Sequence, residues 1–293
     1  MGMIEKAYAK INLALNVKDK RGDGFHNIES VMLPLKLHDS IEIEVRDGKN
    51  GDDFIVCDNF KVGIAKYNLC HRAIEVAREM WGFKESFDIH IHKSIFLQSG
   101  LGGGSSDAAV VLKAITKALK IKVKKEELIE AALKIGSDVP FMLFNKPSLV
   151  TGIGNVIENI DIAESFYDYY VLLCKPNEGI STTRIYSEFD QMKDPEHFDI
   201  KKVVELVKTD TPELKKYIGN SLEKPGFYIV PEIENIKKSL LDRGFDMVFM
   251  TGGGSCVVGL TKNKKLARKT FKEYYVNPNY EAELTRFLNI NKK

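Results

Sequence analysis

A glycine-rich turn that leads directly into an amphipathic helix is the feature that most restricts how this chain folds. Residues 99–109 read SGLGGGSSDAA, with four glycines in the five positions from Gly100 to Gly104. Glycines let the backbone approach a ligand closely and turn its N–H groups toward it. Because a helix N-terminus combines free N–H groups with the positive end of the helix dipole, the segment predicts an anion site.

The loop differs from two familiar phosphate-binding motifs. No Gly-Lys-Ser/Thr follows, so it is not a Walker loop, and Ser105 stands where a dinucleotide fingerprint has its third glycine. Two interpretations stay open: a flexible turn that caps a helix, or a polyphosphate site whose adjacent hydroxyls help to hold a metal-bound nucleotide. We expect Ser105 or Ser106 to cap the helix and Asp107 to lie in its first turn. Its apolar stripe comprises Ala108, Val111, Leu112, Ile115 and Leu119.

Strands and helices are mixed in both halves of the sequence. Alternating or continuous apolar residues predict strands, and helical spacing or stop signals predict helices. The predicted strands are 6–17, 40–45, 87–95, 169–175, the two arms of 246–260 and a short last strand; the predicted helices include 64–81, the helix after the glycine turn, 126–136, 233–244 and one near the end. Because a regular βαβα rhythm is missing, we expect an α+β fold with two domains, 1–160 and 161–293.

The first predicted strand carries a lysine on its polar face. Alternate apolar residues from Ala7 to Val17 form one face, and Tyr8, Lys10 and Asn12 lie on the other. A lone lysine there would ordinarily be solvated.

Composition excludes several classes of protein. The 43 Lys and Arg against 41 Asp and Glu give no reason to propose a nucleic-acid or membrane surface. No signal peptide is evident and no apolar run approaches the ~18 residues of a membrane span, so we expect a cytoplasmic protein. The four scattered cysteines indicate reduced, mostly buried thiols. His90 and His92 share a strand face, which we interpret as solvated because no third ligand lies near in the sequence.

Two further motifs each have two interpretations. In KIGSDVPF (134–141), Gly136 ends a helix, Ser137 can cap the next turn, and Asp138 on its own is an ordinary carboxylate at a helix start. TGGGSCVVGL (251–260) is either a hairpin turn or a second loop near phosphate.

Taken in order, the Lys-Ile-Asn strand, the GLGGGSS loop, GSDVP and TGGGS resemble the GHMP kinase superfamily. RGDGFH (21–26) resembles the members that phosphorylate a hydroxyl of a cytidine-diphosphate-linked alcohol in the non-mevalonate isoprenoid pathway. The resemblance implies an N-terminal domain like the second domain of ribosomal protein S5, a ferredoxin-like C-terminal domain, an active site between them, and ATP with Mg²⁺.

The resemblance also implies roles for individual residues. Asp138 matches the carboxylate that takes the proton from the attacking hydroxyl, and Lys10 matches the lysine that pairs with it. The residues implied for ATP are Gly100, Leu101, Gly102, Gly103, Gly104, Ser105, Ser106, Asn68, Leu69 and Lys93; those implied for the acceptor substrate are Asn12, Phe25, His26, Thr182 and Tyr186. Mg²⁺ is expected to be held mainly by phosphates and water, with Ser105 or Ser106 as a candidate, because no carboxylate stands out for it.

The sequence departs from the family pattern at three places and leaves two alternatives. Leu97 and Gln98 replace a proline segment before the loop, Phe25 is commonly Tyr, and Tyr186 is often Phe. A GHMP kinase for mevalonate or homoserine, whose substrates carry no base to stack, is the alternative enzyme. A nucleotide-binding sensor without turnover is the alternative from another class, against which Lys10 and Asp138 together argue. The partners expected are small molecules; the oligomeric state stays open.

Overall fold

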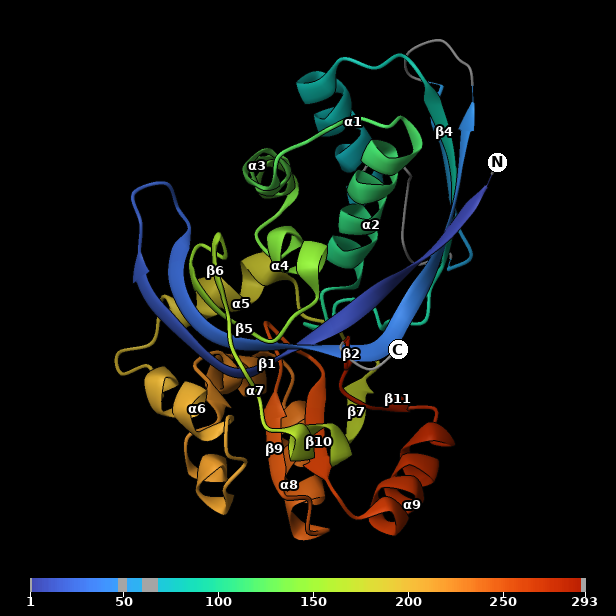
Figure 1. The fold of residues 1–293 in the computed structure, drawn as a ribbon. Coiled ribbons are helices and arrows are strands. Elements are labelled where there is room, and N and C mark those ends of the chain that lie inside the picture. Colours follow the sequence, from blue (N-terminus) through green and yellow to red (C-terminus); the bar gives the residue numbers. More distant parts are fainter. Residues whose placement is uncertain (1, 47–51, 60–67, 291–293) are drawn as a thin grey trace. The chain divides into compact units, whose positions relative to one another are not determined.

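The computed structural model describes residues 2–46, 52–59 and 68–290 (Figure 1). The chain divides into two compact units, neither of which is a single stretch of sequence. Unit 1 comprises Met1–Ala9, Leu37–Ile95 and Gly102–Asn145, and unit 2 comprises Lys10–Lys36, Phe96–Leu101 and Lys146–Lys293. The division passes through two long strands, β1 (Met3–Lys20) and β2 (His26–Arg46). The domain boundary expected near residue 160 stays a prediction.

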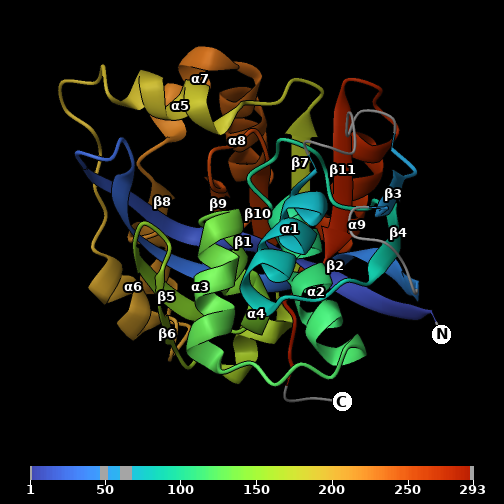
Figure 2. The same cartoon turned by 90° about the horizontal axis from the view of Figure 1, so that it is seen from above.

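The described residues of unit 1 form a sheet and four helices. In the sheet, β2 pairs antiparallel with β4 (Ser86–His92), and β3 (Phe54–Cys57) lies parallel to β4. The helices are α1 (Leu69–Trp81), α2 (Gly103–Ala118), α3 (Lys125–Ile135) and α4 (Val139–Phe144). Figure 2 shows α1, α2 and α3 grouped together, and both α1 and α4 pack against α2.

Local signals explain where these helices begin and end. The Asn68 side chain accepts a hydrogen bond from the Cys70 N–H and caps α1, and Gly82 ends it in the left-handed region. Helix α3 ends at Gly136, as predicted. The predicted helix over 64–81 begins at Leu69; residues 64–67 lie outside the described part of the chain.

The sheet of unit 1 buries one face and exposes the other. Ile41 and Ile43 on β2 and Ile89 and Ile91 on β4 are buried, as their alternation predicts. The intervening residues are exposed or half-buried. Such one-sided burial is common in antiparallel pairs.

Unit 2 contains an antiparallel sheet in the order β11-β7-β10-β9. Its strands are β7 (Tyr170–Pro176), β9 (Met247–Met250), β10 (Val257–Thr261) and β11 (Tyr280–Thr285). The same unit has three shorter strands: β5 (Ser148–Gly152) pairs with β2 and with β6 (Val156–Asn159), and β8 (Gly219–Asn220) runs parallel to β1. The helices are α5 (Thr182–Phe189), α6 (Ile200–Leu206), α7 (Glu223–Ile229), α8 (Glu232–Asp242) and α9 (Lys264–Tyr275), with short 3-10 turns at Glu164–Asp168 and Pro212–Lys216.

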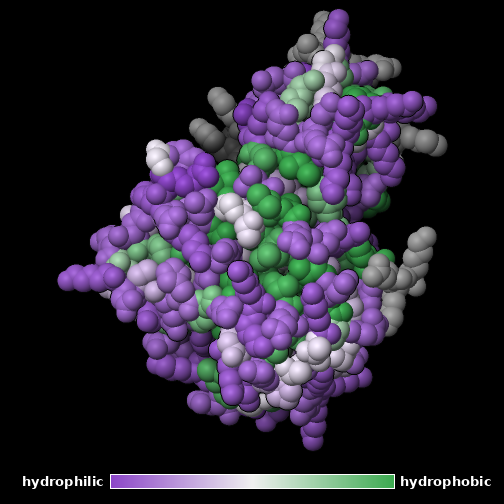
Figure 3. Space-filling view, turned by 60° about the vertical axis from the view of Figure 1, so that its left-hand side comes forward, coloured by the Kyte–Doolittle hydropathy of each residue, from purple (hydrophilic) through white to green (hydrophobic). Residues whose placement is uncertain are grey.

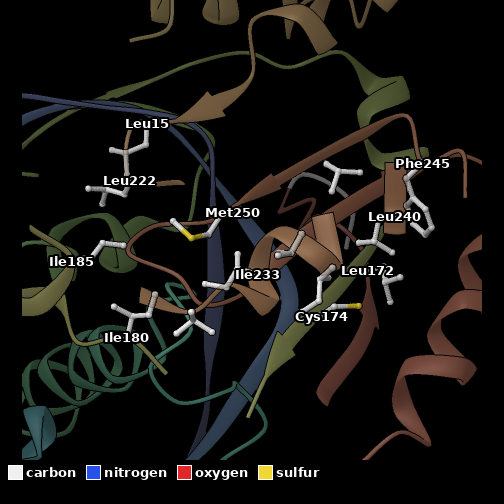
Figure 4. Close-up of a cluster of buried hydrophobic side chains, with 14 of the residues drawn as sticks. Leu15, Leu172, Cys174, Ile180, Ile185, Leu222, Ile233, Leu240, Phe245 and Met250 are labelled. Carbon is white, nitrogen blue, oxygen red and sulfur yellow. The ribbon is translucent and has the colours of Figure 1, made fainter. Parts of the chain in front are cut away.

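The core of unit 2 lies between this sheet and its helices. Figure 4 shows Leu172 and Cys174 of β7, Met250 of β9, and Ile233 and Leu240 of α8 among the side chains that fill it. Leu15 and Val17 of β1 belong to the same cluster. Burial of such side chains contributes roughly 1.5–3 kcal/mol each, so β1 is fixed in unit 2 by its apolar residues.

The polar face of β1 is buried where it carries Lys10 and Asn12. A lone lysine on this face would ordinarily be solvated, but every residue from Ala9 to Val17 is buried. The mixed α+β architecture is confirmed. The four cysteines are free and all but Cys57 are buried, as expected.

In the described residues no helix has the length and apolar character that a membrane crossing requires. Hydrophilic side chains predominate on the face drawn in Figure 3.

Candidate active site

The glycine turn enters α2 by a different geometry from the one predicted. The helix begins at Gly103, and Gly102 occupies the N-cap position with φ 72°, where an L side chain would be strained. The Ser106 N–H donates to the Gly102 carbonyl at 2.9 Å. The prediction that Ser105 or Ser106 caps the helix is therefore wrong, because both lie inside the first turn. Asp107 lies one residue beyond that turn.

The start of α2 packs tightly against other residues that the resemblance assigns to ATP. A Cβ added at Gly103 would lie 3.1 Å from the Ile95 side chain and 3.2 Å from Lys93 Nζ. A Cβ at Gly104 would meet the Leu69 side chain at 3.7 Å. Unit 1 thus brings Gly103, Gly104, Leu69 and Lys93 together.

Lys93 is the centre of a buried charge cluster that sequence reasoning missed. Its Nζ donates to Asp107 Oδ2 at 2.8 Å and also to Asp39 Oδ2. Asp39 Oδ1 in turn accepts from the Ile95 N–H at 2.8 Å. Each of these three charged side chains is at most 4% exposed. The position of Asp107 beside the glycine motif was the one sequence signal that could have suggested this cluster. Nothing in the sequence indicated Asp39.

Two carboxylates sharing one lysine set the protonation of this cluster. Burial raises the pKa of Asp107 to about 7, with the neighbouring Asp39 adding to burial and Lys93 opposing it. Burial lowers the pKa of Lys93, but the two carboxylates outweigh burial, so the pKa is raised overall. Lys93 is therefore a permanent cation, and Asp107 is the group that exchanges a proton near neutral pH.

Two buried oxygens beside the glycine turn have no hydrogen-bond partner among the described residues. They are Ser106 Oγ and Asp107 Oδ1. An unpaired buried polar atom costs about 1–3 kcal/mol. Hydroxyl and carboxylate oxygens are the ligands that Mg²⁺ prefers, so the chemistry of these two atoms fits the expected metal.

Asp138 lies at the N-cap position of α4 and is half-buried. Gly136 ends the preceding helix, and Pro140 in the first turn of α4 has the φ that a helix start needs. The prediction that Ser137 caps this turn is wrong: Ser137 is exposed, and the cap position falls one residue later. Asp138 thus lies directly between the end of α3 and the start of α4.

In unit 2, Lys10 is buried in a polar network. It is 2% exposed, and its Nζ donates to Asn12 Oδ1 at 2.6 Å. Asn12 is fixed in turn, because its side-chain amide donates to Ser30 Oγ at 2.8 Å and its backbone N–H donates to Thr251 Oγ1 at 2.9 Å. A buried ammonium is tolerated only with such polar partners. The sequence singled out Lys10 and Asn12, but neither Ser30 nor the Thr251 hydroxyl.

Both glycine segments of unit 2 meet close to Lys10. Gly100 has φ 77°, and a Cβ there would lie 2.0 Å from the Thr251 carbonyl oxygen. A Cβ at Gly252 would lie 2.9 Å from the Gly100 carbonyl oxygen and 3.3 Å from Lys10 Nζ. The Lys10 N–H donates to the Leu101 carbonyl at 3.0 Å. TGGGS is a hairpin turn between β9 and β10, and it also packs against the segment that begins the first glycine loop.

Of the predicted substrate residues in unit 2, His26 and Tyr186 are brought together. The His26 and Tyr186 ring centroids are 5.0 Å apart, and His26 Nε2 lies 2.6 Å from Asp190 Oδ1. Tyr186 lies one helical turn after Thr182 on α5, which places them on one face. Phe25 is 56% exposed at the turn between β1 and β2. Asp190 was missed, and no spacing links it to the RGDGFH motif.

The sequence of the chain matches a known class of phosphotransferases. The sequence models of two families, "GHMP kinases N terminal domain" and "GHMP kinases C terminal", match residues 68–146 and 203–276. The chain is thereby a small-molecule kinase of the GHMP class.

Individual relatives narrow the assignment. The chain is 34% identical to a 4-diphosphocytidyl-2-C-methyl-D-erythritol kinase from Lachnoclostridium phytofermentans, over 96% of both chains. A crystal structure of 4-(cytidine 5'-diphospho)-2C-methyl-D-erythritol kinase superposes with a TM-score of 0.78 at 25% identity, covering 98% of this chain and 100% of that one. Homoserine kinase from Cytophaga hutchinsonii shares the fold, with a TM-score of 0.73 at 16% identity over 97% and 93%. The chain belongs to the 4-diphosphocytidyl-2-C-methyl-D-erythritol kinase family.

Proposed function

We propose that this chain transfers the γ-phosphate of ATP to the 2-hydroxyl of 4-diphosphocytidyl-2-C-methyl-D-erythritol, a step toward isoprenoid precursors. The substrate is the one that the relatives' name states. The observation that carries the proposal in this chain is the buried Lys10, held by Asn12 and contacted by the glycine segments 100–101 and 251–255. Phosphoryl transfer depends on such fixed positive charge and positioning more than on covalent chemistry.

The chemical step has two residues in proposed roles. Asp138 accepts the proton of the substrate hydroxyl, whose oxygen attacks the γ-phosphorus while the bond from that phosphorus to the β–γ bridging oxygen breaks. ADP leaves with the electron pair of that bond. The Lys10 ammonium offsets the negative charge that develops on the transferred group.

ATP binding is assigned to unit 1 and to the glycine segment that leads into it. The α2 N-terminus offers the backbone N–H groups of Gly102 to Ser105 to phosphate, and Gly100 and Leu101 precede them. Lys93, Asn68 and Leu69 are proposed to surround the nucleotide. Ser106 Oγ and Asp107 Oδ1 would hold Mg²⁺, which supplies positive charge to the phosphates when bound with ATP. Asp107 is a carboxylate that the sequence had not suggested for the metal.

Recognition of the acceptor is assigned to unit 2. With its Nε2–H directed at Asp190, a neutral His26 ring has an acceptor at Nδ1, which complements the N4 amine of cytosine and not the O4 of uracil. Phe25 and Tyr186 supply aromatic faces for the base, Thr182 a hydroxyl, and Asn12 orients the acceptor alcohol. The cytoplasmic location stays a prediction.

A coupled assay of ADP formation tests the proposal. With Mg²⁺ and ATP, the cytidine substrate should be turned over at least a hundredfold more efficiently, by kcat/KM, than homoserine or mevalonate. Turnover of homoserine or mevalonate instead would assign the chain to another GHMP substrate. Binding of ATP without turnover of any of the three would support the sensor alternative.

A further inference from the structure

The exposed face of the unit 1 sheet carries a group of side chains that the kinase reaction does not use. His90 and His92 lie two residues apart on β4, and Glu42 on β2 is the register partner of His90. The candidate ligand atoms of Glu42, His90 and His92 all lie within 4.8 Å of one another. The expectation that the histidines lack a third ligand is therefore wrong, because strand pairing supplies one from 48 residues away in the sequence.

The geometry points to a binding site for a divalent transition metal of the zinc type, formed by Glu42, His90 and His92. Two imidazoles and one carboxylate are a ligand set that suits Zn²⁺, with a water completing the shell. Imidazole nitrogens do not suit Mg²⁺, so this site is separate from the proposed catalytic metal and does not depend on the proposed function.

A fourth residue, Asp58, lies beside the second ring nitrogen of one ligand. Asp58 Oδ2 lies 3.5 Å from His92 Nδ1, on the side of the ring away from Glu42. Asp58 is itself anchored, since Oδ1 accepts from the Lys93 N–H at 3.0 Å and its own N–H donates to the Ile91 carbonyl at 3.1 Å. A carboxylate that accepts the second ring N–H of a ligating histidine fixes its tautomer and orientation.

The atoms that would bind the ion already face one another. His92 Nε2 and Glu42 Oε1 form a hydrogen bond at 3.3 Å. A metal ion bound here would replace the proton between these two atoms. The His90 and His92 ring centroids are 4.2 Å apart, so the His90 imidazole is close enough to be the third ligand.

The side chains need only small movements to bind the ion. Metal–nitrogen and metal–oxygen bonds of about 2.0–2.2 Å correspond to ligand atoms about 3.4 Å apart in a tetrahedral site. Glu42 is exposed and both histidines are half-buried, so rotation about their side-chain bonds can close the distance. The bound ion would join β2, which carries Asp39, to β4, which ends directly before Lys93.

Calorimetric titration of ZnCl₂ into the chelator-treated full-length protein, in buffer without Mg²⁺, tests the proposal. The expected result is one Zn²⁺ per chain with a micromolar or lower Kd. His90→Ala, His92→Ala and Glu42→Gln should each weaken binding at least tenfold, and Asp58→Asn by about 10–100-fold. His197→Ala, which removes an exposed histidine in a loop of unit 2, should bind Zn²⁺ like the wild type.

Two further measurements keep the outcome clear. Circular dichroism shows whether each variant is folded, and Glu42→Gln, a change at an exposed position, tests the site if a histidine variant is not. Co²⁺ added to the wild type should give visible bands without a thiolate charge-transfer band, and Cys57→Ser should leave Zn²⁺ binding intact. A Kd unchanged in folded His90→Ala and Glu42→Gln, binding lost in Cys57→Ser, or no saturable binding would overturn the proposal.

Discussion

His26 Nε2 lies 2.6 Å from Asp190 Oδ1, although 164 residues separate them in the sequence. Lys20 donates to the other oxygen of the same carboxylate. Burial raises the pKa of Asp190, but the hydrogen bonds from Lys20 and His26 outweigh it, so the pKa is lowered overall. Asp190 is thus ionised at neutral pH and directs the His26 ring, which makes it a positioning residue for the proposed cytosine subsite.

Asp190→Asn should weaken recognition of the cytidine substrate and leave ATP alone. An asparagine can present its amide N–H₂ to His26, which favours the opposite tautomer and removes the acceptor at Nδ1. The KM for the cytidine substrate should rise about fivefold to a hundredfold, the worth of one lost contact of ~1–3 kcal/mol, with the KM for ATP unchanged. Asp194→Asn, at an exposed position of the following loop, is the matched control. Equal effects on both KM values would contradict the role given to Asp190.

Asp138→Asn should slow the chemical step without disturbing the nucleotide. Removal of a positioned general base costs about 10²–10⁴ in rate, so kcat should fall by that factor while ATP affinity in a direct binding assay stays near that of the wild type. Lys10→Ala should lower kcat as well.

The control for Asp138 is Glu126→Gln, which removes a carboxylate from the exposed first turn of α3. It should retain wild-type kcat. If Asp138→Asn kept a kcat within threefold of the wild type, Asp138 would have no part in proton transfer.

The Lys93 cluster should make stability depend on pH with a definite sign. Asp107 has a pKa of about 7 in the folded chain and an ordinary value near 3.8 when unfolded. The folded pKa is the higher one, so the contribution of Asp107 to the free energy of unfolding is fully present below pH ~4. This contribution is lost as the pH rises to 7, by about 1.4 kcal/mol per pH unit. Asp107→Asn cannot titrate, so it lacks this dependence.

Urea unfolding of wild type and Asp107→Asn at pH 5, 6, 7 and 8 measures the effect. The free energy of unfolding of the wild type, relative to the variant, should fall between pH 5 and 7 and level off toward pH 8. A difference that stayed level from pH 5 to pH 8 would mean that Asp107 is ionised throughout this range and that its pKa is not raised.

Gly103→Val should weaken ATP binding at least tenfold because the added side chain would crowd its neighbours, not because it would strain the backbone. Left-handed φ is required at Gly100 and Gly102, not at Gly103. At Gly103 an added side chain would press on Ile95 and Lys93 Nζ, at 3.1 and 3.2 Å from its Cβ. Gly22→Ala, where no atom lies within 4 Å of an added Cβ, should bind ATP normally. Normal ATP affinity in a folded Gly103→Val protein would place the phosphates elsewhere.

The sequence predicts features that depend on neighbouring residues better than features that depend on residues far apart in the chain. Periodicity and glycine signals are local, so they located the last part of β2 (residues 40–45), β4, α3 and the hairpin at Thr251. The order of the motifs indicated the family. Partners brought together by strand pairing or tertiary contact left no local trace: Asp39 for Lys93, Asp190 for His26 and Glu42 for His90. The helix cap was misplaced because Gly102 starts α2 through its backbone conformation, which no side-chain pattern reports.

The two aromatic residues proposed to stack on the cytosine base, Phe25 and Tyr186, lie in different environments. Phe25 is exposed, whereas Tyr186 packs against the His26 ring at 5.0 Å between centroids. Phe25→Ala should therefore leave the free energy of unfolding nearly unchanged, and Tyr186→Ala should lower it. Each should weaken the cytidine substrate by about 1–3 kcal/mol, the worth of stacking on one base, with the KM for ATP unaltered. Phe25→Tyr keeps the stacking face, so its kinetics should be nearly those of the wild type.

Tyr228→Ala, at a tyrosine that is 76% exposed, controls for the loss of a surface aromatic ring. Steady-state kinetics with the cytidine substrate and its uridine analogue complete the test, because stacking accepts either base and the His26 acceptor does not. Equal turnover of the uridine analogue, or a raised KM for ATP in the alanine variants, would leave the substrate of this kinase unassigned.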